Sequence, residues 1–194
     1  MCTKQIRARA IRAFVGIAFV LLALSGAAAV AQQQGQAQQV QEEQAQQALL
    51  SEQDVEFARK AARGGMLQVA LSKVATKQAS SQPVQQFAQQ TVDSMSQAGK
   101  QLRSIAQQLG LDLPQQPGEQ TQQLQDALAD LEGDLLEREY MWNMVAASTV
   151  AVNVFEEEVE DGTNPRLVSF ADQMLPKLQQ HREQAVQIWG NVGE

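Results

Sequence analysis

Apolar residues recur every three or four positions along most of this chain, which is the spacing that predicts amphipathic α-helices. The clearest case runs from Pro83 to Leu109, where an apolar stripe faces a surface made mostly of glutamine. Pro83 suits the first helical turn, and Gly110 suits the left-handed residue that follows a helix. We therefore predict a single helix of about 27 residues here, and it needs partner helices to cover its stripe.

Two further helical regions flank this segment. The first begins at Ser51, which with Asp54 resembles a helix cap, and its apolar stripe continues through Gly64-Gly65 towards Ala75. At the paired glycines we expect the close approach of a neighbouring helix, or a kink. The second region places four leucines at helical spacing, and its stripe resumes beyond Gly133, which weakens the helix locally without necessarily ending it. The leucines are Leu124, Leu128, Leu131 and Leu135, and the later stripe is Met141, Met144, Ser148, Val152, Phe155 and Val159.

A last helix is predicted from about Pro165 to Trp189, with a bend at Pro176. The residues from Gly162 to Asn164 should close the preceding helix and cap this one. No stretch has a convincing strand pattern. Four long amphipathic segments joined by glycine- and proline-marked turns predict an all-α fold, a four-helix bundle over residues 51–190.

The first 31 residues have the pattern of a cleaved Sec-type export signal. A basic start precedes the apolar stretch Ala13–Leu24, and Ala29-Val30-Ala31 is a small-x-small cleavage site, so we expect cleavage after Ala31. The apolar stretch is shorter than the roughly 20 residues that span a bilayer. We expect a periplasmic or secreted protein with no stable membrane anchor after cleavage, whose glutamine-rich leader, residues 32–50, is disordered.

Cleavage changes the charge and the thiol content. Loss of four basic residues and no acidic ones takes the formal charge from −7 to −11, which argues against a nucleic-acid partner. Cys2 leaves with the signal, so the mature chain can form no disulfide. Acids crowd one segment, Glu156, Glu157, Glu158 and Glu160, and such a run is usually a solvated helix face.

Candidate chemistry is sparse. One histidine, His181, cannot build an iron or zinc site without Glu-x-x-His pairs or cysteines, so we expect no preformed cofactor. A softer ligand set is the alternative, because thioether and imidazole groups suit Cu(I). Its candidates on inward-facing stripes are His181, Met95, Met144 and Met174. Methionine is equally an adaptable filler of helical cores, and His181 fits a position at the bundle edge, hydrogen-bonded to a neighbour or water.

Enzymatic activity is not expected. The chain has no Gly-x-Ser-x-Gly elbow, and the mature part has no cysteine nucleophile. Trp142 and Trp189, the only tryptophans, fit ordinary positions at the rim of a core.

An ordered set of residues along the chain resembles the family called domain of unknown function 4142. The set comprises Phe57, Ala61-Ala62, Gly64-Gly65, Val84, Phe87-Ala88, Leu102, Ala106, Gly110, Leu113-Pro114, Gly133, Tyr140, Phe155-Glu156, Phe170-Ala171, Leu175-Pro176, Leu178 and His181. The resemblance implies an exported bacterial protein with a ferritin-like helical bundle and no settled biochemical activity. The family pattern has a glutamate after the paired glycines, an Asp-His pair in the second helix and a histidine eight residues after the tyrosine. Gln68, Ser94-Met95 and Ser148 occupy those places here.

Two hypotheses about function follow. The first is an exported, noncatalytic helical module, an interaction or stress-related protein that binds an unknown protein partner or forms a homo-oligomer. The alternative is a metal-binding protein, with copper the leading candidate, or an oxidative-stress protein of ferritin-like architecture. Substituting His181→Ala separates them, because only the second hypothesis requires its imidazole.

Overall fold

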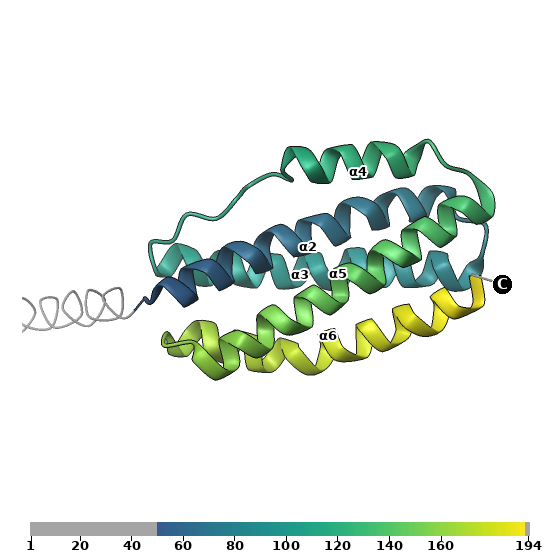
Figure 1. Ribbon diagram of the computed structural model, residues 1–194. Coiled ribbons are helices and arrows are strands. Elements are labelled where there is room, and N and C mark those ends of the chain that lie inside the picture. The colour runs from purple at the N-terminus through teal and green to yellow at the C-terminus, as the bar shows by residue number, and fades with distance from the viewer. Residues whose placement is uncertain (1–49, 193–194) are drawn as a thin grey trace, which may run out of the picture. The chain divides into compact units, whose positions relative to one another are not determined.

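The computed structural model describes residues 50–192, which fold into five α-helices without a β-strand (Figure 1). The helices are α2 (Glu52–Gln78), α3 (Gln82–Gln108), α4 (Glu119–Ala129), α5 (Gly133–Asp161) and α6 (Pro165–Val192). The prediction of an all-α protein is confirmed. The predicted export signal and nearly all of the glutamine-rich leader lie outside the described residues. No helix between residues 50 and 192 has the length and apolar character needed to cross a membrane.

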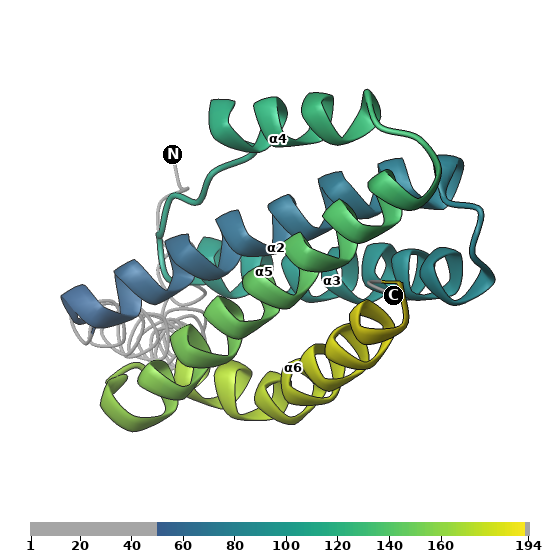
Figure 2. The same ribbon diagram turned by 45° about the vertical axis from the view of Figure 1, so that its right-hand side comes forward.

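Four long helices pack side by side, with each antiparallel to its neighbours. α2 contacts α3 and α5, while α6 contacts α5 and α3. The short helix α4 lies outside, against α2 and α5, as Figures 1 and 2 both show. It carries the chain from the end of α3 back to the opposite end of the assembly, which is why α5 can run antiparallel to α2.

The helical region around Gly133 is divided, so five helices replace the four predicted. α4 ends at Ala129, and α5 begins at Gly133, whose φ of +57° lies in the left-handed region that favours glycine. Only Leu128 of α4 is fully buried, whereas α5 buries residues along its whole length. The chain therefore turns at Gly133 between two separate helices, rather than passing through one weakened helix.

The predicted helix ends are largely confirmed. The Ser51 hydroxyl accepts a hydrogen bond from the Asp54 amide at 3.1 Å, while the Asp54 carboxylate accepts one from the Ser51 amide at 2.6 Å. This reciprocal pair is a capping box. Gly110 follows α3 with a φ of +68°. Asn164 caps α6 through its side-chain oxygen, which accepts hydrogen bonds from two amides of the first turn.

The expected close approach at Gly64 and Gly65 is wrong. α2 runs unbroken through both glycines, and a Cβ added at either would meet no heavy atom within 4 Å. The glycines border open space rather than a neighbouring backbone.

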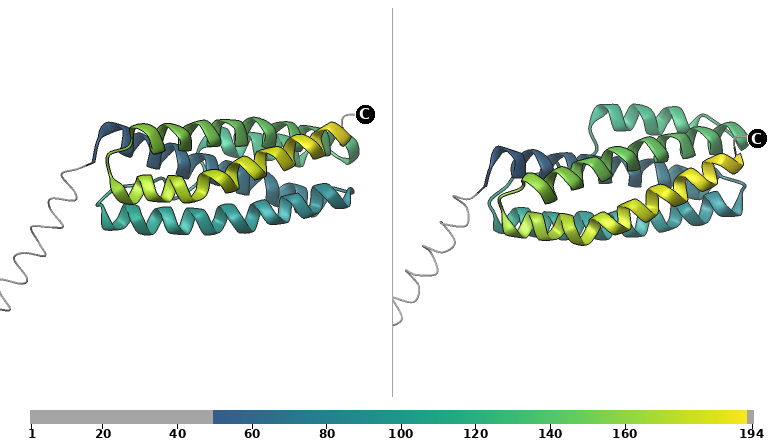
Figure 3. Two further views of the ribbon diagram at one scale, coloured as in Figure 1. Left: turned by 90° about the horizontal axis from the view of Figure 1, so that it is seen from below. Right: turned by 60° about the horizontal axis from the view of Figure 1, so that its bottom comes forward.

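The buried apolar residues form two clusters rather than one continuous core. One cluster is centred on Phe57, Phe155 and Phe170, with ring centroids 5.0 to 6.5 Å apart. The other surrounds Phe87 and Tyr140. α6 contributes to both, continues through Pro176, and changes direction part-way along its length (Figure 3).

Candidate functional site

A chain of buried polar side chains crosses the interior of the bundle and draws one member from each long helix. The Ser72 hydroxyl of α2 lies 2.9 Å from the Tyr140 hydroxyl of α5. Thr91 of α3 lies close enough to Tyr140 to influence the pKa of its phenol, and the Thr91 hydroxyl lies 3.5 Å from Nε2 of His181 on α6. Burial raises the pKa of Tyr140 more than Ser72 and Thr91 lower it, so the phenol stays protonated.

His181 is an interior residue, so its predicted place at the bundle edge is wrong, while the predicted hydrogen bond to a neighbour is present, with Thr91. Only 9% of it is exposed, and its ring stacks on Phe87 with centroids 4.5 Å apart. Burial lowers the pKa of His181 to about 4, which keeps the imidazole neutral at pH 7. The Thr91 hydroxyl donates to the Phe87 carbonyl at 2.8 Å, so it is an acceptor for Nε2–H. This assignment leaves the lone pair of Nδ1 available.

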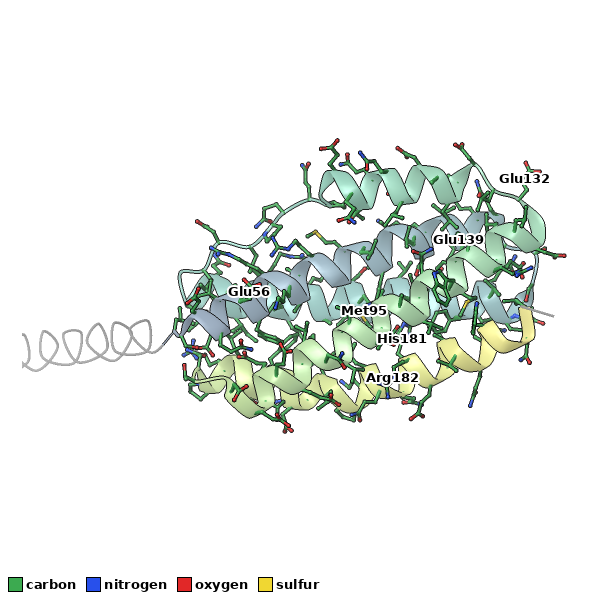
Figure 4. All side chains as sticks on the ribbon, viewed as in Figure 1. Glu56, Met95, Glu132, Glu139, His181 and Arg182 are labelled. Carbon is green, nitrogen blue, oxygen red and sulfur yellow. The ribbon has the colours of Figure 1, made fainter. Side chains whose placement is uncertain are left out.

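Three of the four candidate metal ligands line one groove between α3 and α6. His181, Met95 and Met174 border a cavity of about 510 Å³ with otherwise mostly polar walls. Figure 4 shows Met95 and His181 near the middle of the assembly. Met144 does not line this groove; its sulfur lies 3.9 Å from the Ser72 hydroxyl. Between residues 50 and 192, no group of three histidine, cysteine, aspartate or glutamate side chains is placed to hold a metal ion.

Two buried carboxylates clamp the turns at opposite ends of the bundle. Asp54 of α2 accepts hydrogen bonds from the amides of Thr163 and Asn164, at 3.0 and 2.9 Å, in the turn between α5 and α6. Glu137 of α5 accepts from the amides of Ser80 and Ser81, at 2.7 and 2.6 Å, before α3. Each carboxylate satisfies backbone groups that a helix start leaves without partners.

Glu158 is the exception in the acidic run that the sequence suggested was a solvated face. It is fully buried, and neither carboxyl oxygen meets a hydrogen-bond donor within residues 50–192; the Asp54 carboxylate is the group beside it. Burial, followed by the neighbouring charge of Asp54, raises the pKa of Glu158 to about 8. Burial would also raise the pKa of Asp54, but hydrogen bonds from Thr163, Asn164 and Ser51 outweigh it and hold that pKa well below its usual range.

An exposed aromatic pair joins α5 to α6. Trp142 is 54% exposed and Trp189 is 37% exposed, and their ring centroids lie 5.6 Å apart. Leu135, two turns before Trp142, and Val186, one turn before Trp189, are exposed as well. We call these four residues the tryptophan surface. Trp142 is therefore more exposed than the predicted rim position, and Trp189 is close to it.

Several of these residues escaped the sequence reasoning. Thr91, Ser72 and Glu137 are common polar types whose burial becomes visible only once the neighbouring helices are placed. For Glu158 a signal existed, because it lies three residues after Phe155 and so shares the inward face of α5.

Comparison with known proteins places the chain in a family. The model of the family described as domain of unknown function, DUF4142, matches residues 39–188. The chain belongs to this family. No curated protein sequence is significantly similar to it.

Solved structures that share the fold of this DUF4142 protein include two DUF305 proteins. A DUF305 fragment from Deinococcus radiodurans superposes with a TM-score of 0.64 at 13% identity, covering 73% of this chain and 98% of that one. A DUF305 protein from Streptomyces coelicolor, named a "putative secreted protein", gives 0.63 at 15% identity, covering 73% and 92%. At these identities the likeness concerns the fold alone.

Proposed function

We propose that this protein is an exported, noncatalytic interaction module, a ferritin-like four-helix bundle that acts in the periplasm or outside the cell. The observation that carries the proposal is the tryptophan surface on α5 and α6. Large aromatic residues exposed side by side on a monomer are typical of protein-binding sites. The export signal predicted from the first 31 residues supports the location.

The buried polar chain supports a structural role rather than catalysis. The Thr91 hydroxyl donates its hydrogen bond to the Phe87 carbonyl and not to His181, so it is not an activated nucleophile. Tyr140 is held between Ser72 and Thr91 and is fully buried. These groups satisfy one another across the four long helices, as buried hydrogen-bond networks that fix a core do.

A second copy of the chain is the partner that the tryptophan surface fits best. Helical spacing places charged residues of both signs one turn before its members, Arg138 and Glu139 before Trp142 on α5 and Arg182 and Glu183 before Val186 on α6. A two-fold axis would bring the apolar residues of two copies together and set basic groups opposite acidic ones. A mixed rim of this kind is self-complementary, whereas a single-sign rim would repel its copy.

Sedimentation equilibrium of residues 32–194 tests this proposal. We expect a reversible dimer at micromolar concentrations, and the double substitution Trp142→Ala, Trp189→Ala should weaken it by about 100-fold or more, as loss of aromatic hot spots does. Val150→Ala, which removes another exposed apolar group from α5, is the matched control and should leave dimerisation unchanged. A wild-type chain that stays monomeric, or a double variant that dimerises as well as wild type, would contradict the proposal.

Copper binding is a second candidate, because one specific observation favours it. The α3–α6 groove gathers Met95, Met174 and neutral His181, and two thioethers with one imidazole form a ligand set that suits Cu(I). The lone pair of Nδ1 is the one that would bind the metal.

Mass spectrometry of the untagged mature protein after Cu(I) loading tests this candidate. If the groove is a copper site, one equivalent binds, His181→Ala abolishes binding, and Met95→Leu or Met174→Leu weakens it by about tenfold or more. Met144→Leu is the matched control, since Met144 lies outside the groove. A wild-type protein that takes up no copper, or a His181→Ala variant that keeps it, rules the copper candidate out.

A further inference from the structure

A second, larger cavity of about 1080 Å³ lies along the side of α2 that carries Gly64 and Gly65. It is partly open to solvent, and its lining comes mainly from α2, α3 and α5. Small residues from these three helices make up much of its wall, among them Ala61, Gly64, Gly65, Ala98, Gly99 and Ala147. Because alanine and glycine do not fill the space between packed helices, the two apolar clusters leave this volume empty of protein atoms. Its size is near the upper end of the range for small-molecule sites.

The inner wall of this cavity is apolar. Met95, Met174 and Leu178, all buried in the cluster around Phe57, line it together with Phe155 and Phe170. An alkyl chain placed there would leave water for a hydrocarbon surface, and each methylene buried would add to its affinity.

The outer wall is strongly basic, although the chain is acidic. Five cations line the cavity, Lys60, Arg63 and Lys73 from α2 with Lys100 and Arg103 from α3, and Glu157 is the one acid among the lining residues. Arg63, Lys73, Lys100 and Arg103 form no ion pair within residues 50–192, and Lys60 pairs with exposed Glu56 at 3.5 Å. The Arg103 guanidinium lies over α3 beside Gly99, where an added Cβ would be in ordinary contact with it, 3.6 Å from the nearest nitrogen.

Four of these five cations lie close in sequence to a glycine of their own helix. Lys60 and Arg63 lie on successive turns of α2 with Gly64, and Lys100 and Arg103 lie on successive turns of α3 with Gly99. Both helices thus present basic side chains next to their own glycines, and on α2 these glycines border open space. A carboxylate, sulfate or phosphate group would find several unpaired donors there, with arginine able to bind it in bidentate fashion.

We propose that this cavity binds a single-chain amphiphile with an anionic headgroup, a long alkyl carboxylate being the simplest example. The headgroup lies against the cations of α2 and α3, and the alkyl tail enters past Gly64 and Gly65 towards Met95 and Leu178. This binding site is separate from the tryptophan surface and does not depend on it.

Isothermal titration calorimetry of residues 32–194 with dodecanoate, below its micelle concentration, tests the proposal. We expect one site, and dodecylammonium, with the same tail and the opposite charge, should bind at least about tenfold more weakly. Gly65→Leu fills the cavity and replaces a helix-weakening glycine by a strong helix former, so the variant should stay folded while affinity falls at least about tenfold. Arg63→Glu should have a comparable effect, and Arg59→Glu, one turn earlier on α2 and outside the cavity, should change affinity by less than about twofold.

The opposite results overturn the proposal. They are a wild-type protein that binds no dodecanoate, equal binding of dodecylammonium, or undiminished binding by the Arg63→Glu variant. If circular dichroism shows that Gly65→Leu does not fold, the comparison of Arg63→Glu with Arg59→Glu decides on its own, because both positions lie on exposed turns of one helix.

Discussion

Replacing Asp54 by alanine is expected to lower the free energy of unfolding by about 3 kcal/mol, the largest effect of any single polar substitution in the bundle. The carboxylate accepts hydrogen bonds from the amides of Thr163 and Asn164 and from the Ser51 amide and hydroxyl. Alanine would leave these donors without their acceptor and would undo both the capping box of α2 and its link to the α5–α6 turn. Urea unfolding followed by circular dichroism measures the change.

The matched control for Asp54 is Glu52→Ala. Glu52 is another acid in the first turn of α2, but it is exposed and makes none of these contacts. It should cost no more than about 0.5 kcal/mol, the value of a favourable charge at a helix start. Equal effects of the two substitutions would show that Asp54 acts only through the helix dipole. Its hydrogen bonds to the α5–α6 turn would then contribute nothing to the free energy of unfolding.

Glu158→Gln is expected to make the protein more stable at alkaline pH. The pKa of Glu158 is about 8 in the folded protein against an ordinary value of 4.5, so the folded state holds a proton that the unfolded state has released. Between these values the free energy of unfolding of the wild type should fall by up to about 1.4 kcal/mol per pH unit. The loss begins above pH 4.5 and is complete above pH 8. Glutamine, which is neutral at every pH, removes this loss.

Urea unfolding between pH 6.5 and 9 isolates the contribution of Glu158. The pKa of His181 is lowered from 6.5 to about 4, so its effect on the free energy of unfolding lies below this window. There the unfolded state binds a proton that the folded state does not, which lowers stability as the pH falls. Over the same window Glu160→Gln, at an exposed position of the same acidic run, should keep the wild-type pH dependence. An unchanged slope in Glu158→Gln would mean that Glu158 is ionised in the folded state at neutral pH.

The helices of this fold could be predicted from the sequence because their signals are local. The stripe from Pro83 to Leu109, the cap at Ser51 and the left-handed Gly110 each depend on residues a few positions apart. The break at Gly133 was harder, since a helical region can continue through or stop at a glycine, and only the packing of Leu128 against α2 and α5 decides between them.

The candidate sites could be predicted only in part, because they are made by distant residues. That His181, Met95 and Met174 face inward followed from helical spacing, but their meeting in one groove, and the separation of Met144 from it, required the arrangement of α3 and α6. The close approach or kink predicted at Gly64 and Gly65 is wrong for a physical reason. Small residues predict close packing when a neighbour fills the space, and they leave a cavity when the neighbouring helices also carry alanine and glycine.

Intrinsic fluorescence as a function of protein concentration tests the central claim most directly. The chain has two tryptophans, Trp142 and Trp189, and both belong to the proposed interaction surface, so the whole tryptophan signal reports on it. Dilution of the mature protein from about 100 μM to below 1 μM should shift the emission to longer wavelength, as a dimer with a typical micromolar dissociation constant exposes its interface. An emission spectrum that stays at the wavelength of solvent-exposed tryptophan at every concentration would contradict the assignment of this surface as the site of association.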